Sequence, residues 1–283
     1  MPNSMDDLIA QICIGGFSVT LTLFICLCAV IIVFDGKATP TSKSNVKNAF
    51  NIHLCVMIVA NMGIFASQYG FSIYTRNDKA PFICGVVTKL FLAAAESSYI
   101  FYSWHRSSLV LKAMLPKYVS NVGILVRVAP VVFFLQPIPD LARAIMSSQP
   151  GPLEVKKTDI VFVASSAVMG ASALIAIAFD AILLRTFTRY LRISFGAQDR
   201  KQEGGTSKSF LIISRFGCAA IVLKVSCLIV FGYATLLASE EAYYLYITIA
   251  YSLLTIVWLV LFLMKISLLF QKHMHATSEV VIN

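Results

Sequence analysis

Two charged residues, Glu96 and Lys224, lie deep inside long apolar stretches of this sequence. A charge at bilayer depth is costly, so such a residue usually faces the interior of a helix bundle and has a partner there. The number of residues from Ile83 to Glu96 equals the number from Lys224 to Leu237. Ile83 and Leu237 are the expected outer ends of two antiparallel segments. Equal depth predicts an ion pair between Glu96 and Lys224, if good geometry offsets the cost of burial. This pair is the candidate ligand-binding site.

Arg127 and Asp180 form a second candidate pair, because they lie at similar depths, nearer the inner ends of their segments. We expect both to belong to a polar network inside the membrane. The alternative for either pair is a purely structural bridge, or separate contacts to water and backbone carbonyls.

Basic residues mark the inner ends of the same two segments. His105 and Arg106 end the segment that contains Glu96, and Arg215 lies at the inner end of the segment that contains Lys224. These residues are either ordinary interfacial cations or a contact surface for a cytoplasmic partner.

No recognisable catalytic pattern accompanies these charges. The sequence has no GxSxG, HExxH or P-loop motif in a suitable context, and its 7 cysteines show neither metal spacing nor a disulfide framework. We therefore expect no enzyme activity, no metal site and no cofactor. A retinal Schiff base on Lys224 is a weak alternative. Both rhodopsin types carry that lysine in mid-helix seven, whereas here Lys265 is close to the inner end of the seventh segment.

Membrane-spanning helices must position these residues. The chain has 283 residues, of which 58% are hydrophobic and only 13% are charged, whereas about 25% are charged in soluble domains. A run of about 20 apolar residues crosses the hydrocarbon as a helix. The sequence predicts an all-α, seven-helix transmembrane bundle forming one domain over residues 1–283, with helices near 8–34, 49–73, 83–111, 118–145, 160–190, 210–237 and 243–270.

The Lys and Arg residues near the segment ends set the expected orientation. Most of them gather on one side of the bundle, and the positive-inside rule places that side in the cytoplasm. The N-terminus is then outside and the C-terminus inside. The net charge of +9 reflects this topology, and we expect no nucleic-acid binding. The predicted location is the plasma membrane, with the lipid bilayer as the first partner.

Two departures from regular helix are predicted. The fourth segment contains Pro130, Pro137 and Pro139, which should kink it toward its outer end. The connection Leu191–Ser209 is polar and contains glycine, so it is expected to be a mobile cytoplasmic loop.

Two local patterns resemble the rhodopsin-like G-protein-coupled receptors. In the second segment, Asn51 followed by Ala60-Asn61 is similar to that family's helix-two pattern, with Asn61 at the place of the sodium-binding Asp. In the third, Arg106 stands where the family's Asp/Glu-Arg-Tyr motif has its arginine. The Cys-Trp-x-Pro and Asn-Pro-x-x-Tyr motifs of helices six and seven are missing.

The resemblance implies signal transduction by a rearrangement of helices three and six in response to an unknown small ligand. It implies a heterotrimeric G protein as partner, contacted by His105, Arg106 and Arg215, and it adds Asn61 to the polar network. Two other functions stay open. One is a small-solute transporter, although seven is an odd number for paired halves. The other is a structural or accessory subunit of a membrane complex.

Overall fold

The structure is a computed structural model that describes residues 4–35, 49–73, 80–146, 154–197, 204–237 and 240–282. Within these ranges the chain is almost entirely helical: α1 (Ser4–Val30), the π-helix η1 (Ile31–Asp35), α2 (Ala49–Ile73), α3 (Ala80–Met114), the 3-10 helix η2 (Pro116–Tyr118), α4 (Val119–Phe133), α5 (Pro137–Met146), α6 (Glu154–Ala197), α7 (Gly204–Leu237) and α8 (Glu240–Ile282). In this described part, 7 segments are long and apolar enough to cross a membrane. The predicted seven-helix bundle is confirmed.

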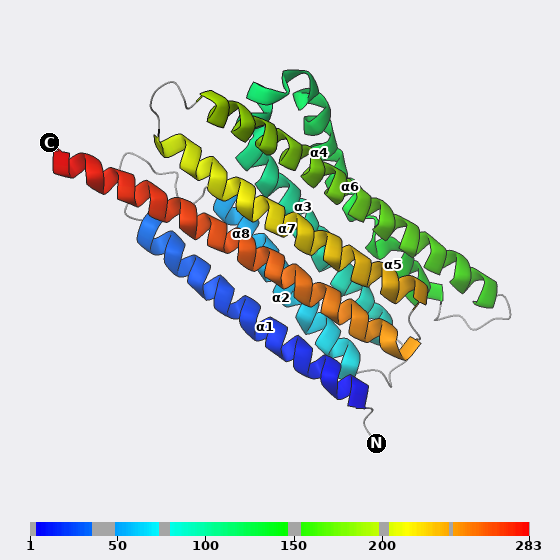
Figure 1. Ribbon diagram of the computed structural model, residues 1–283. Helices are drawn as coiled ribbons and strands as arrows, with labels where there is room; N and C mark the ends of the chain where they lie inside the picture. Colours follow the sequence, from blue (N-terminus) through cyan, green and yellow to red (C-terminus); the bar gives the residue numbers. More distant parts are fainter. Residues whose placement is uncertain are drawn as a thin grey trace.

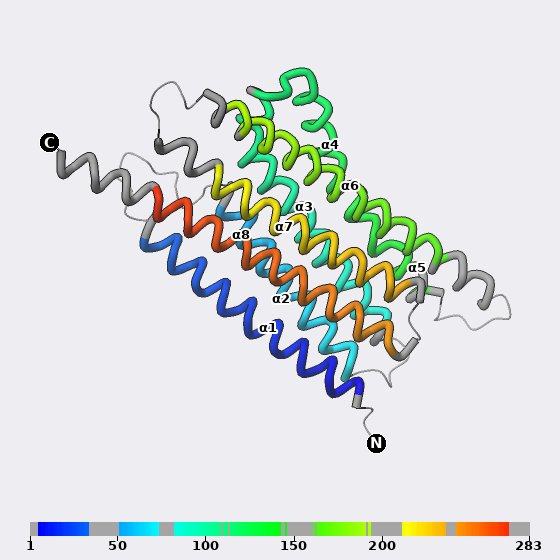
Figure 2. The backbone as a smooth tube through the Cα atoms, viewed as in Figure 1, coloured from blue at the N-terminus to red at the C-terminus, as the bar shows by residue number. Residues whose placement is uncertain are grey.

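Helix α3 contacts four other helices of the bundle. It packs against α2, α4, α5 and α6, while α8 packs against α1, α2 and α7. The long helices run roughly along one direction (Figure 1). Figure 2 shows α7 lying between α6 and α8, the two helices that it contacts. Helix α7 is therefore joined to α3 mainly through its neighbours.

Glycines allow α1, α2 and α3 to approach one another closely. A Cβ atom on Gly16 of α1 would lie only 2.4 Å from the ring of Phe65, and one on Gly63 of α2 would lie 2.5 Å from the ring of Phe91. Small residues let helices pack tightly in membranes, where van der Waals contact drives association. A side chain in place of either glycine would therefore force the facing ring to move.

The fourth membrane segment is broken into α4 and α5, and the break lies where prolines were expected to distort it. Pro137 and Pro139 have no backbone N–H to donate to the carbonyls of Phe133 and Leu135. Those carbonyls accept hydrogen bonds from amides only three residues later, from Gln136 at 3.1 Å and from Ile138 at 3.2 Å, so the chain turns more tightly than in an α-helix. The turn places Gln136 inside the bundle, where its side chain is 1% exposed.

Helices α6, α7 and α8 are longer at the predicted inner end than their apolar runs indicated. The expected loop Leu191–Ser209 is helical up to Ala197 and again from Gly204, and only 198–203 lie outside the described residues. Helix α8 likewise continues past Phe270 to Ile282. Polar residues can extend a helix beyond the bilayer, and there hydropathy no longer separates helix from loop. The orientation of the bundle across the membrane stays a prediction.

Candidate functional site

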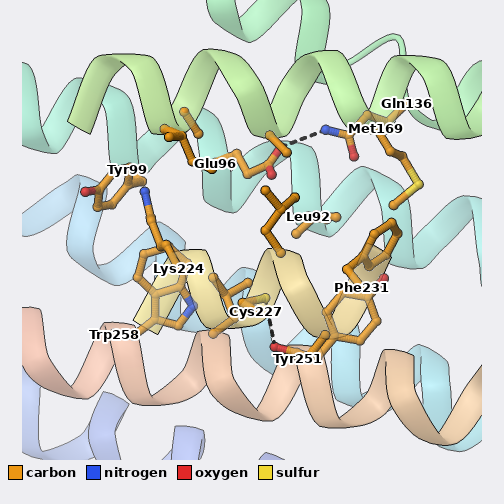
Figure 3. A pocket seen from close by; sticks show the side chains of 16 residues that line it. Leu92, Glu96, Tyr99, Gln136, Met169, Lys224, Cys227, Phe231, Tyr251 and Trp258 are labelled. Carbon is orange, nitrogen blue, oxygen red and sulfur yellow. Dashed lines mark hydrogen bonds between the residues drawn. The ribbon is translucent and has the colours of Figure 1, made fainter. Parts of the chain in front are cut away.

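A cavity lies in the middle of the bundle, between α3, α6, α7 and α8 and beside the turn that separates α4 from α5 (Figure 3). Its volume is about 110 Å³. An apolar cavity of about 150 Å³ in a protein interior holds benzene, so this one has room for a few waters or a ligand of about five heavy atoms. The wall is mostly apolar and aromatic, and its polar side chains include Glu96, Gln136 and Lys224.

Glu96 projects from α3 into this cavity and is held by the broken fourth segment. The side-chain amide of Gln136 donates a hydrogen bond of 2.7 Å to Oε2 of Glu96 (Figure 3). Gln136 can reach α3 because the turn before Pro137 directs it inward. Glu96 forms no ion pair with any described side chain. Its described partner is thus a neutral amide.

Lys224 pairs with Asp180 rather than with Glu96. Its Nζ lies 2.9 Å from Oδ2 of Asp180 on α6, and the two side chains are only 12% and 3% exposed. The hydroxyl of Tyr99 on α3 donates a hydrogen bond of 2.5 Å to the other carboxylate oxygen. Nζ of Lys224 also lies 3.0 Å from the centre of the Tyr99 ring. We call Tyr99, Asp180 and Lys224 the three-helix junction, since they join α3, α6 and α7.

The predicted ion pair between Glu96 and Lys224 is therefore wrong, although both residues line one cavity. Counting residues gave the depth of each side chain but not its direction around the helix axis. Helix α7 packs against α6 and α8, so Lys224 finds its carboxylate on α6. In Figure 3 the Lys224 side chain points toward Tyr99, and Glu96 points toward Gln136.

The second predicted pair, Arg127 with Asp180, is also wrong. Arg127 is exposed on the outer surface of α4, and the carboxylate of Asp180 is occupied by Lys224 and Tyr99. A long arginine on a lipid-facing surface can extend toward the headgroups, so it needs no partner inside the bundle.

Asn61 takes part in a different contact between α2 and α8. It is fully buried, and its side-chain amide donates a hydrogen bond of 2.8 Å to the hydroxyl of Thr255. Its carbonyl oxygen has no hydrogen-bond partner among the described residues. Asn61, Arg127 and Asp180, expected as one network, thus have separate surroundings.

A second cluster of charges, at the outer end of the bundle, was not predicted. Nζ of Lys89 on α3 lies 2.7 Å from Oδ2 of Asp140 on α5, and it donates a hydrogen bond of 2.6 Å to the hydroxyl of Ser165 on α6. Lys89 lies within an apolar run of the sequence, and its partner Asp140 lies beyond the helix break. Hydropathy alone gave no sign of Asp140 as that partner.

At the inner end, Arg106 is turned into the bundle. Its Nη1 donates to the sulfur of Met264 on α8 at 2.8 Å, and its guanidinium carbon lies 5.8 Å from the ring centre of Phe187 on α6. Its Nε is buried and has no hydrogen-bond partner among the described residues. Arg106 thereby links α3 to α6 and α8.

The other two residues proposed at the inner end are accessible. His105 and Arg215 are both exposed, on α3 and α7 respectively. The ring of His105 stacks on that of His53 from α2, with centroids 5.8 Å apart. Nearby, the buried Lys265 of α8 donates a short hydrogen bond to the side chain of Asn51 on α2. This end of the bundle therefore combines buried contacts between helices with an exposed histidine and an exposed arginine.

Comparisons with protein-family models, with curated proteins and with solved structures find no match to this chain. The site is therefore interpreted from its own geometry. In the described part of the chain, no group of three or more His, Cys, Asp or Glu side chains could hold a metal ion. The cavity wall has one carboxylate, one lysine that is paired with Asp180, and several aromatic rings. Such a set is suited to binding a small molecule.

Proposed function

We propose that this protein is a receptor of the plasma membrane, which binds a small ligand in the central cavity and signals to a heterotrimeric G protein in the cytoplasm. One observation carries the proposal: the three-helix junction of Tyr99, Asp180 and Lys224 lies at the wall of the cavity. Buried ion pairs of this kind in membranes mark functional sites. Here the pair joins α6 to α7 at the depth where a ligand would bind.

The junction supplies a way for a ligand to change the arrangement of the helices. A ligand shifts an equilibrium between two conformations only by its difference in affinity for them. Two of the junction residues, Tyr99 and Lys224, are also cavity residues. A ligand that contacts them therefore interacts differently with the joined and separated states of α3, α6 and α7. A coupling of about 1–3 kcal/mol between two sites would be typical.

The inner ends of the same helices are suited to transmit this change. Arg106 links α3 to α6 and α8, and a shift of α3 against those helices would alter its contacts with Met264 and Phe187. Helix α7 contains no proline, so it would move as a rod or bend near Gly217 or Gly232, where a Cβ atom would meet nothing within 4 Å. The exposed His105 and Arg215 are the proposed contacts for the G protein.

The test is guanine-nucleotide exchange on G proteins co-expressed with this chain. We expect exchange above the level of cells that lack the protein, and we expect Arg106→Ala to reduce it with unchanged surface expression. Arg127→Ala is the matched control, since Arg127 is an exposed arginine outside the cavity and the inner contacts. If no G protein responds to the wild type or to Lys224→Met, the receptor proposal is wrong.

One observation favours transport as a second candidate function. The fourth segment is interrupted within the membrane, and Gln136 from the interruption reaches Glu96 in the cavity. Transporters commonly build substrate sites from such interrupted helices near the midplane. Uptake of labelled solutes into proteoliposomes separates the two functions, because a receptor binds its ligand without moving it across the bilayer.

A further inference from the structure

The charges at the cavity do not balance. Lys224 is neutralised by Asp180 at 2.9 Å, and Tyr99 donates a further hydrogen bond to that carboxylate. Glu96 has only the neutral amide of Gln136 as its described hydrogen-bond partner. With all three groups ionised, the cavity therefore carries one net negative charge, located on Glu96. An isolated charge inside a membrane is strongly disfavoured, so Glu96 either takes up a proton or pairs with a positive ligand.

The remaining wall suits the body of an organic cation rather than a bare metal ion. The rings of Tyr99, Phe231, Tyr251 and Trp258 line the same cavity. Aromatic faces attract ammonium groups, more strongly when water is excluded. Lys224 already demonstrates this contact, since its Nζ lies 3.0 Å above the centre of the Tyr99 ring. The volume of about 110 Å³ limits the ligand to a small molecule.

We propose that the central cavity binds a small aliphatic amine in its ammonium form, with Glu96 as the counter-ion. This inference deepens the proposed function, because it names the ligand class of the same site. Gln136 positions the carboxylate through its 2.7 Å hydrogen bond, and the aromatic wall takes the apolar part of the ligand.

An anionic ligand is disfavoured by the same geometry. Lys224 is the basic side chain on the cavity wall, and an anion could form an ion pair with it only by displacing Asp180. The displaced carboxylate would then be a second buried negative charge beside Glu96. A neutral ligand would form no ion pair with Glu96, which would then have to take up a proton or stay charged without a partner. An ammonium ligand therefore suits the charges of the cavity better than an anionic or a neutral ligand.

The test compares three probes of similar size on the purified full chain in lipid nanodiscs. Butylammonium, 1-butanol and butyrate share a short alkyl group and differ in charge. Binding is measured by calorimetric titration at one ionic strength, and thermal unfolding confirms that each variant is folded. The variants are Glu96→Gln, which keeps the size and the hydrogen-bonding oxygen, and the control Asp7→Asn, which removes one exposed carboxylate far from the cavity wall.

We expect the wild type and Asp7→Asn to bind butylammonium at least tenfold more tightly than 1-butanol, and we expect Glu96→Gln to abolish that preference. Equal binding of the three probes to the wild type would overturn the proposal. So would a preference for butyrate, or a preference for butylammonium that survives in Glu96→Gln.

These outcomes are separate from those of the proposed receptor function, because binding is measured without a G protein. Selective binding of butylammonium without any nucleotide exchange would support the amine site and contradict the receptor. Nucleotide exchange stimulated by another ligand, in a protein that binds no ammonium probe, would support the receptor and contradict the amine site.

Discussion

Lys224 of α7 and Asp180 of α6 form an ion pair of 2.9 Å inside the helix bundle, with their side chains 12% and 3% exposed. The pair is completed by the hydroxyl of Tyr99, which donates to the same carboxylate. In the described part of the chain, it is the ion pair that joins α6 to α7. We expect both the stability of the bundle and its proposed switching to depend on this pair.

Removing one member of the pair should destabilise the protein more than neutralising both. Lys224→Met leaves Asp180 as a buried charge without its cation. Asp180→Asn leaves Lys224 as a buried charge without its anion. Each single substitution should cost about 3–5 kcal/mol, and the double substitution should cost less than the sum of the two. Thermal unfolding of the four proteins in one lipid environment measures this coupling.

Arg127→Met is the matched control for that series. It removes a cation from a membrane segment, but Arg127 is exposed and Lys224 is not. It should leave the unfolding temperature nearly unchanged. Additive losses in the double variant of Lys224 and Asp180 would show that the two side chains are not coupled.

The hydrogen bond between Gln136 and Glu96 makes a second prediction about stability. Gln136→Leu removes the donor at 2.7 Å and should cost about 1 kcal/mol, the usual size of a hydrogen bond between membrane helices. Gln68→Leu is a suitable control, since Gln68 is also buried but its bond to Thr88 is longer, at 3.3 Å. A larger loss from Gln68→Leu than from Gln136→Leu would contradict the importance assigned to the Glu96 contact.

The sequence allowed the depth of the buried charges to be predicted, but not their partners. Glu96 and Lys224 do line the same cavity, as their equal distance from the helix ends indicated. Which way each side chain points depends on how the helices pack, and hydropathy carries little of that information. The almost uniformly apolar α7 gave no sign that Lys224 faces α6.

Gln136 was missed for a different reason. Pro130, Pro137 and Pro139 predicted a distortion in the fourth segment, and the break lies there. A glutamine next to a proline has no distinctive pattern of its own, however. Only the geometry of the turn brings it to Glu96. The seven membrane segments, by contrast, follow from length and hydropathy alone. Several of their helices extend beyond the predicted bounds at both ends, as α6 does.

The orientation of the bundle is open to a direct test. Reporter tags at the N-terminus and immediately before Gly204 should lie on opposite sides of the membrane, with the second in the cytoplasm, because five membrane segments separate them. Protease protection in sealed vesicles measures this. Two tags on the same side would contradict the assigned topology and remove the cytoplasmic role of Arg106 and Arg215.

The proposed mechanism requires that breaking the three-helix junction separates the inner ends of α3 and α7. Spin labels on genetically encoded amino acids at Lys112 and Arg215, both exposed, report that distance in lipid nanodiscs. Compared with the wild type, Lys224→Met should populate a longer distance between the labels, and Arg127→Met should not. If Lys224→Met and the wild type give the same distance distribution while both remain folded, the junction does not control the inner ends and the proposed signalling mechanism is wrong.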